Sequence, residues 1–144
     1  MMKVQTSAKA YADFFESITP KTSLEEYSKV FDEKVYFEDP FQKITGAEKV
    51  YDVFEHMYAT LYDPKFDVKE IICEKECAYL RWDFSYQRSI KHDIEKFTGV
   101  SRVQFLENGK VISHIDYWDA AENIYEKIPI IGYILRQIKK RITA

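Results

Sequence analysis

The chain has 144 residues and a formal net charge of −3, which fit a single domain and give no general reason to expect nucleic-acid binding. It lacks a run of about 18 apolar residues that could span a membrane, and residues 1–15 do not have the pattern of a secretory signal. We therefore expect a compact cytoplasmic protein whose two cysteines are reduced. Aromatic residues make up 16% of the chain, enough to line an apolar cavity as well as a core.

Three helices are predicted in the first half of the chain. Apolar residues recur at helical spacing over residues 11–18, and a Thr-Pro pair ends that run. Ser23 and Glu26 form a capping-box pattern, which opens a short second helix that carries Phe31 at its end. A third amphipathic helix is expected over residues 47–61, where an Asp-Pro pair follows.

Strands are predicted at residues 35–38 and, from alternating hydrophobicity, throughout residues 65–119. A hairpin loop over residues 74–76 would set Cys73 opposite Cys77 on the polar face of the sheet. A cross-strand disulfide and two reduced thiols are the alternatives for this pair. The same register places on the core face Phe66, Val68, Ile72, Leu80 and Trp82.

A second hairpin is indicated by the Asn-Gly pair at residues 108–109, because a two-residue turn with positive φ at both positions favours this dipeptide. The register it sets pairs Val103 with His114 and Ser101 with Asp116 on one mostly apolar face. Opposed side chains lie about 5 Å apart, so Ser101 and Asp116 are within reach of a hydrogen bond. Polar groups on such a face are unfavourable unless they are paired or line a cavity.

Asp39 stands in the run Val-Tyr-Phe-Glu-Asp-Pro-Phe at residues 35–41. Pro40 disfavours helical backbone at Asp39 and removes a backbone donor, so a carboxylate is fixed at a strand end among aromatic residues. An acid in that position is a candidate for proton transfer. The alternative is that Asp39 only starts a turn, which is the commonest use of Asp-Pro.

The order of helices and sheet, the Phe-Glu-Asp-Pro-Phe run before Gly46, and the run Asn-Gly-Lys-Val-Ile-Ser-His-Ile-Asp-Tyr-Trp-Asp at residues 108–119 resemble the nuclear transport factor 2-like superfamily. Within it, the chain is most similar to the SnoaL-like polyketide cyclase and ketosteroid isomerase branches. The resemblance extends over about residues 11–125. It implies an α+β cone, in which a strongly curved antiparallel sheet wraps the N-terminal helices around a deep apolar pocket.

The resemblance places Asp39 where ketosteroid isomerase keeps its general base, opposite an oxyanion hole of a tyrosine and a protonated aspartic acid. Aligned without gaps, the tyrosine position reads Phe15 and the aspartic acid position reads Ser101. Further pocket tyrosines appear as Phe31 and Phe54. Because both oxyanion donors are replaced, steroid isomerisation itself is not expected.

Asp116 fits the resemblance to SnoaL-like cyclases, which use an aspartate on a pocket-lining strand. Asp39 and Asp116 are therefore the candidate acid and base. His114 on the same face is either a third catalytic candidate or a core side chain bonded to a neighbour. The expected ligand-binding residues are Phe15, Phe31, Phe54, Trp82, Ser101, Val103 and Trp118. No histidine pair has metal-ligand spacing and no glycine-rich phosphate loop is present, so we expect neither a metal nor a cofactor.

These patterns predict a pocket for a small apolar molecule, in a protein that forms a homodimer through the outer face of its sheet. The enzymatic interpretation is acid/base isomerisation, cyclisation or dehydration of a carbonyl compound. The alternatives are a noncatalytic module that binds a small ligand or lipid, and a protein-interaction domain.

Residues 128–144 differ in character from the cone domain predicted over residues 1–127. Basic residues alternate with isoleucines there, no acid follows Glu126, and Pro129 can open a helix. We expect this amphipathic helix to pack on the same domain or on a partner subunit. Peripheral contact with a membrane surface is the alternative.

Overall fold

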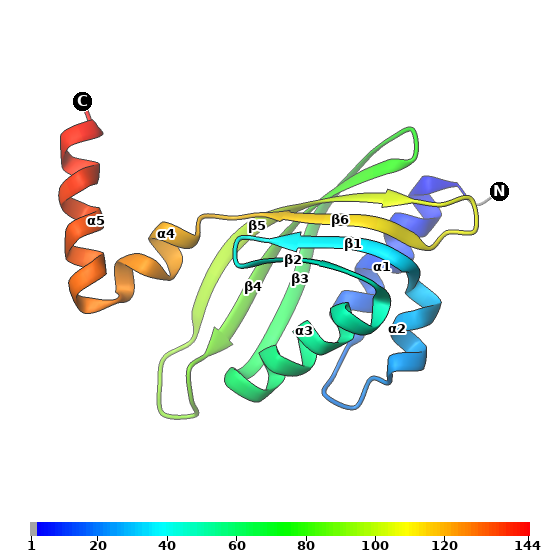
Figure 1. Cartoon of the computed structure of the whole chain (residues 1–144), viewed down its shortest axis with the longest axis horizontal. Coiled ribbons are helices and arrows are strands. Elements are labelled where there is room, and N and C mark those ends of the chain that lie inside the picture. The colour runs from blue at the N-terminus through cyan, green and yellow to red at the C-terminus, as the bar shows by residue number, and fades with distance from the viewer. Residues whose placement is uncertain (1–2) are drawn as a thin grey trace.

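The computed structural model describes residues 3–144 and shows a curved sheet that holds helices in its concave face, with a helical tail to one side (Figure 1). The elements are α1 (Val4–Ser17), α2 (Leu24–Val30), β1 (Phe31–Asp39), β2 (Gln42–Thr45), α3 (Ala47–Thr60), β3 (Tyr62–Glu74), β4 (Cys77–Gln87), β5 (Glu95–Phe105), β6 (Val111–Tyr117), α4 (Ala120–Asn123), the 3-10 turn η1 (Tyr125–Lys127) and α5 (Pro129–Ile142). None of the helices described is long and apolar enough to cross a membrane.

The six strands form one sheet in the order β2-β1-β6-β5-β4-β3. The α+β cone is confirmed, but the sheet is mixed, because β1 runs parallel to β6 while the other neighbours are antiparallel. Alternating hydrophobicity shows that a segment is a strand and does not show which strand lies beside it. This parallel pair matters for the site, because it sets Phe37 directly beside His114.

The second helix begins as predicted and ends earlier than predicted. Ser23 Oγ accepts a hydrogen bond from the backbone N–H of Glu26 at 3.2 Å, and the backbone N–H of Ser23 donates to Glu26 Oε2 at 2.8 Å, which completes the capping box. The helix stops at Val30. Phe31 is the first residue of β1 rather than the last residue of the helix, and its side chain is completely buried.

The β3–β4 turn is shorter than predicted by one residue. Only residues 75 and 76 form it, so Cys73 lies opposite Ala78, and Glu74 lies opposite Cys77. Cys73 therefore packs against the core, while Cys77 lies on the outer face, where Arg102 contacts its sulfur. Both thiols are free, and their positions on opposite faces of the sheet do not suit a cross-strand disulfide.

An irregularity between Val68 and Glu70 also shifts the register of β3. Phe66 and Val68 face the core as predicted. Beyond the irregularity the alternation is displaced by one residue, so Ile71 packs on the core and Ile72 is 59% exposed. The sequence offers no glycine or proline at this place to mark the irregularity.

The β5–β6 turn contains three residues instead of two. The backbone N–H of Leu106 donates to the carbonyl of Lys110 at 2.8 Å, and that of Gly109 donates to the carbonyl of Leu106 at 2.9 Å. Of the Asn-Gly pair only Gly109 has a positive φ, 85°. The turn is thus a tight turn followed by a glycine bulge rather than the predicted two-residue turn.

A second irregularity compensates for the longer turn. Ile112 is an extra residue in β6, and beyond it the strands return to the predicted register. Val103 pairs with His114 and Ser101 pairs with Asp116, as predicted. The register that places the polar residues on the inner face is therefore confirmed, although the turn that was expected to set it differs.

Gly99 provides the space that the indole ring of Trp82 occupies. The two residues lie opposite each other on β5 and β4, and a Cβ atom on Gly99 would overlap the six-membered ring of Trp82. Any side chain at this position would force the indole out of its place on the inner face of the sheet.

We predict that Gly99→Ala lowers the free energy of unfolding by about 1–3 kcal/mol, because overpacking displaces a buried side chain. Urea denaturation measures this. Lys96→Ala, at an exposed position on the same strand, should change stability by only about 0.5 kcal/mol. Equal stability of Gly99→Ala and the parent protein would contradict the steric role of this glycine.

Candidate active site

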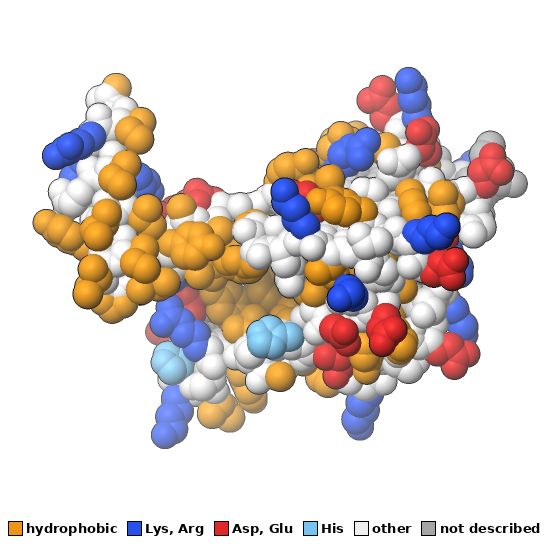
Figure 2. Space-filling model, in the orientation of Figure 1, with side chains coloured by type: hydrophobic (Ala, Val, Ile, Leu, Met, Phe, Trp, Pro, Cys, Tyr) orange, Lys and Arg blue, Asp and Glu red, His pale blue; other side chains and the backbone are white. Residues whose placement is uncertain are grey.

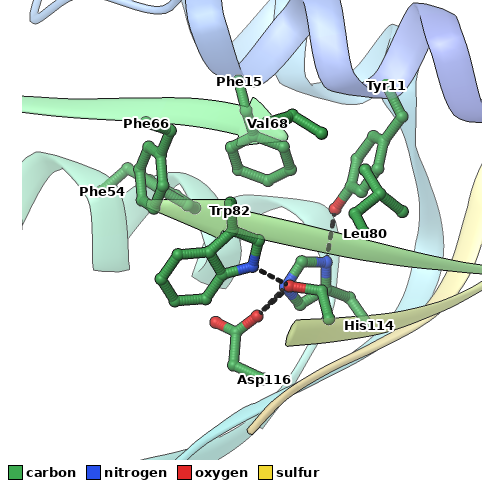
Figure 3. A pocket seen from close by; sticks show the side chains of 10 residues that line it. Tyr11, Phe15, Phe54, Phe66, Val68, Leu80, Trp82, His114 and Asp116 are labelled. Atoms are coloured by element: carbon green, nitrogen blue, oxygen red, sulfur yellow. Dashed lines mark hydrogen bonds and ion pairs between the residues drawn. The ribbon is translucent and has the colours of Figure 1, made fainter. Parts of the chain in front are cut away.

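A chain of hydrogen bonds crosses the inner face of the sheet from α1 to β4 (Figure 3). The hydroxyl of Tyr11 lies 2.7 Å from His114 Nδ1, and His114 Nε2 lies 2.6 Å from Asp116 Oδ1. Ser101 Oγ donates to the same carboxylate oxygen over 2.5 Å and accepts a hydrogen bond from Trp82 Nε1 over 2.8 Å. Five side chains from α1, β4, β5 and β6 thus form one network.

The donors and acceptors in this network are mutually consistent. An ionised Asp116 can only accept, so Ser101 donates its hydroxyl proton and His114 donates from Nε2. The remaining ring nitrogen of a neutral His114 then accepts from Tyr11. Burial, reinforced by the negative charge of Asp116, holds the pKa of Tyr11 well above its ordinary value, so its hydroxyl keeps the proton it donates.

The strand register explains why these side chains meet. His114 and Asp116 are two residues apart on β6, so both point to the inner face. Ser101 lies directly opposite Asp116 on β5. The ring of Phe37 on β1 stacks on the His114 imidazole with centroids 4.7 Å apart and planes 9° apart. His114 is 3% exposed, and its ring orientation is fixed by packing and by hydrogen bonds at both nitrogens.

Asp116 lines a cavity with a carboxylate that is only partly engaged in the network. Its side chain is 16% exposed, and both hydrogen bonds from the described side chains go to Oδ1. Oδ2 is therefore the part of the carboxylate that a bound molecule can reach. This is the arrangement expected of an acid/base group that is held by one oxygen and reacts through the other.

Two cavities meet at Asp116. The inner one has a volume of about 30 Å³, enough for an isolated water molecule. The larger one, about 390 Å³, falls in the range of small-molecule sites. Phe54, Phe66, Trp82 and Asp116 line both. The larger cavity opens to the surface, and Figure 2 shows a hollow with hydrophobic walls beside the segment that leads to α5.

Asp39 also lines the larger cavity, but its carboxylate is engaged in its own turn. Oδ1 accepts from the backbone N–H groups of Phe41, at 2.8 Å, and Gln42, at 3.1 Å, and Oδ2 accepts from Gln42 Nε2 at 2.9 Å. The turn interpretation of the Asp-Pro pair therefore describes what this side chain does in the structure. Its pairing with Asp116 as acid and base stays a prediction.

The other predicted ligand-binding residues divide into two groups. Phe15 and Ser101 line the inner cavity, Trp118 lines the larger one, and Phe54 and Trp82 line both. Phe31 and Val103 do not line either cavity, because both side chains are completely buried in the core. Phe31 faces the helices, where its ring packs against Tyr11 and Tyr27.

Tyr11 is a site residue that the sequence interpretation treated only as part of a helix face. It lies one helical turn before Phe15, and the two rings are in edge contact at 4.7 Å. The gapless alignment to ketosteroid isomerase placed Phe15 at the position of the catalytic tyrosine. The hydroxyl group that enters the site belongs instead to Tyr11, in the preceding turn of α1. The available signal was that a tyrosine on a buried helix face needs a partner for its hydroxyl.

His56 and Tyr86 also reach the larger cavity, from α3 and β4. His56 does so from an exposed position on its helix. Among residues 3–144, no group of three His, Cys, Asp or Glu side chains is placed to hold a metal ion.

We predict that Tyr11→Phe lowers the free energy of unfolding by about 1–3 kcal/mol, because it leaves the buried Nδ1 of His114 without a donor. Chemical denaturation measures the loss. The matched control is Tyr36→Phe, which removes a hydroxyl bonded to Glu38 near solvent and should change stability by only about 0.5 kcal/mol. Equal effects of the two substitutions would argue against a structural role for the Tyr11 hydroxyl.

Comparisons with known proteins agree with this architecture. The model of the SnoaL-like domain matches residues 8–114. A nuclear transport factor 2-like protein from Burkholderia pseudomallei K96243 superimposes with a TM-score of 0.69 at 15% identity, covering 85% of this chain and 95% of that one. A candidate SnoaL-like polyketide cyclase from Jannaschia sp. CCS1 gives 0.70 at 8% identity, covering 82% and 88%.

A protein with a ketosteroid isomerase-like fold from Catenulispora acidiphila DSM 44928, solved in complex with trimethylamine, gives a TM-score of 0.69 at 10% identity and covers 82% of this chain and 88% of that one. None of the curated proteins matches the chain. At these identities the structural likenesses establish the fold alone. The match to the domain model covers most of the chain, and the protein therefore belongs to the SnoaL-like domain family.

Proposed function

We propose that the protein binds a small apolar carbonyl compound in the larger cavity and transfers a proton on it, with Asp116 as the acid/base group. The observation that carries this proposal is the asymmetry of the Asp116 carboxylate in the cavity wall, because Oδ1 receives two hydrogen bonds from the described side chains and Oδ2 receives none. The reaction class is isomerisation, cyclisation or dehydration, and the family membership supports chemistry of this kind.

In the proposed reaction Asp116 Oδ2 takes a proton from the carbon next to the substrate carbonyl. The C–H bond breaks, an O–H bond forms, and the electron pair moves to the carbonyl oxygen as an enolate. The same carboxyl group then returns the proton to another atom of the substrate, so no oxidant or reductant is needed. Ser101 and His114 keep Asp116 oriented throughout, and Tyr11 keeps His114 oriented.

Tyr86 brings a hydroxyl group to the cavity wall that can donate a hydrogen bond to a bound carbonyl compound. It lines the larger cavity, and burial raises its pKa, so its hydroxyl keeps its proton. Asp39 has a supporting part in this scheme: with its carboxylate held by Phe41 and Gln42, it shapes the turn that forms one wall of the cavity.

The test is proton exchange in deuterated water with a panel of cyclic and aryl ketones, followed by NMR. Asp116→Asn should reduce exchange by about 100-fold or more, because an amide cannot take the proton. The control is Asp39→Asn, which keeps an oxygen acceptor for the turn and should leave exchange within about threefold of the parent. Undiminished exchange by Asp116→Asn would refute the assignment.

A noncatalytic module for a small ligand or lipid is the second candidate function. One observation in its favour is the cavity wall, which is mostly aromatic and aliphatic. Another is that the Asp39 carboxylate is engaged in its own turn. Asp116 is then the one carboxylate with a free oxygen among the described cavity residues. Under this interpretation the Asp116 network would only fix the shape of the cavity.

Ligand binding can be measured separately from chemistry. Trp82 and Trp118 line the larger cavity, so their fluorescence should change on binding of a ketone or a fatty acid. Val53→Phe fills part of that cavity and should weaken binding by about tenfold, as expected for a tightly packed apolar site. Ile72→Phe on the outer face should leave binding unchanged. Binding without exchange by any ketone would favour the noncatalytic function.

A further inference from the structure

Helix α5 stands away from the sheet, to the left in Figure 1, instead of packing on the domain. Six of its large apolar side chains face solvent, each with at least 49% of its surface exposed: Ile130, Ile131, Tyr133, Ile134, Ile138 and Ile142. The structure therefore does not show the predicted packing on the same domain. An exposed apolar surface of this extent on one helix indicates a binding partner.

The polar side of α5 is attached to η1, so the direction of the apolar side is fixed. Gly132 is buried, and a Cβ atom there would overlap the carbonyl oxygen of Glu126. Arg136 donates from Nη1 to the same carbonyl at 2.7 Å, and Lys139 pairs with the Glu126 carboxylate at 3.3 Å. A further ion pair, between Lys127 and Glu95 at 2.6 Å, ties η1 to the start of β5.

The charges of α5 are all positive. Its four cations are Arg136, Lys139, Lys140 and Arg141, and it contains no acid. With about 3.6 residues per turn, Arg141 lies within the isoleucine face and Lys140 lies beside Tyr133 at its edge, while Lys139 lies on the side that pairs with Glu126. Cations that flank a broad apolar face suit an interface where the apolar side enters lipid and the cations meet anionic headgroups.

Hydrophobic surface continues from α5 over the α4–η1 segment to the hollow beside α3 (Figure 2). Phe41, 54% exposed, contacts both Trp118 and Tyr125 in this region. The apolar face of α5 is thus part of a larger surface that reaches the mouth of the cavity. Aromatic side chains at such a border are typical of membrane interfaces.

We propose that α5 docks on the surface of an anionic lipid membrane. With 14 residues the helix is about 21 Å long, shorter than the hydrocarbon core of about 30 Å, so it lies in the interface and does not cross it. Pairing with α5 of a second copy is disfavoured, because each helix would bring Lys140 and Arg141 to the contact and α5 contains no acid to pair with them. The proposal concerns a surface outside the cavity and does not depend on the proposed proton transfer.

Co-sedimentation of the full chain with vesicles tests the docking. We expect binding to vesicles of equal parts phosphatidylcholine and phosphatidylserine, weak binding to phosphatidylcholine alone, and loss of binding as salt concentration rises. The double substitutions Lys140→Glu with Arg141→Glu, and Ile134→Ser with Ile138→Ser, should each weaken binding by about tenfold or more.

The matched control is the double substitution Lys21→Glu with Lys34→Glu, which makes the same change in net charge at exposed positions far from α5 in the chain. This control should leave vesicle binding within about twofold of the parent protein. Circular dichroism checks that every variant is folded. Failure of the parent protein to bind anionic vesicles would overturn the proposal. So would a dimer, detected by light scattering, that dissociates on the isoleucine substitutions, since a second copy would then cover this face.

Discussion

The carboxylate of Asp116, removed from most of its water, is the constraint on which the rest of the structure depends. An ionised carboxylate in apolar surroundings is strongly unfavourable unless hydrogen bonds replace its hydration. Here one bond comes from Ser101 on β5 and one from His114 on β6, and those donors are held in turn by Trp82 on β4 and Tyr11 on α1. The bonds that make the charge tolerable also fix α1 against the sheet, so the fold and the site share the same contacts.

Aromatic rings form much of the wall of the larger cavity next to this network. They contact one another edge to face, as Phe66 does with Trp82, whose ring centroids lie 5.8 Å apart. Gly99 allows the Trp82 indole to lie close against β5, where its N–H donates to Ser101. A single glycine therefore decides both the position of a cavity-lining ring and the donor that Ser101 receives.

The sequence was sufficient for the first three helices and the long strands, because each rests on local periodicity, but β2 and α4 were not predicted. The pairing of Ser101 with Asp116 was predicted correctly from a two-residue turn, although the structure has a three-residue turn and an extra residue at Ile112 instead. The sequence was not sufficient for the irregularities at residues 69 and 112 or for the parallel β1–β6 pair, which arise from packing between distant segments. The largest omission, the bond between Tyr11 and His114, joins residues 103 positions apart. Such a contact leaves no trace in the spacing of residues, and only the need to satisfy a buried hydroxyl points to it.

The two aspartates show how the surroundings of a carboxylate, rather than its position in a motif, decide what it can do. Asp39 stands in the more recognisable run of residues, yet both of its oxygens accept hydrogen bonds within a turn of four residues. Asp116 lines the larger cavity with one oxygen held by two donors and the other without a hydrogen bond from the described side chains. A carboxylate whose oxygens both accept hydrogen bonds within its own turn is occupied in holding that turn. One that keeps a free oxygen in an apolar cavity combines a fixed orientation with an accessible basic atom, which is what proton transfer from carbon requires.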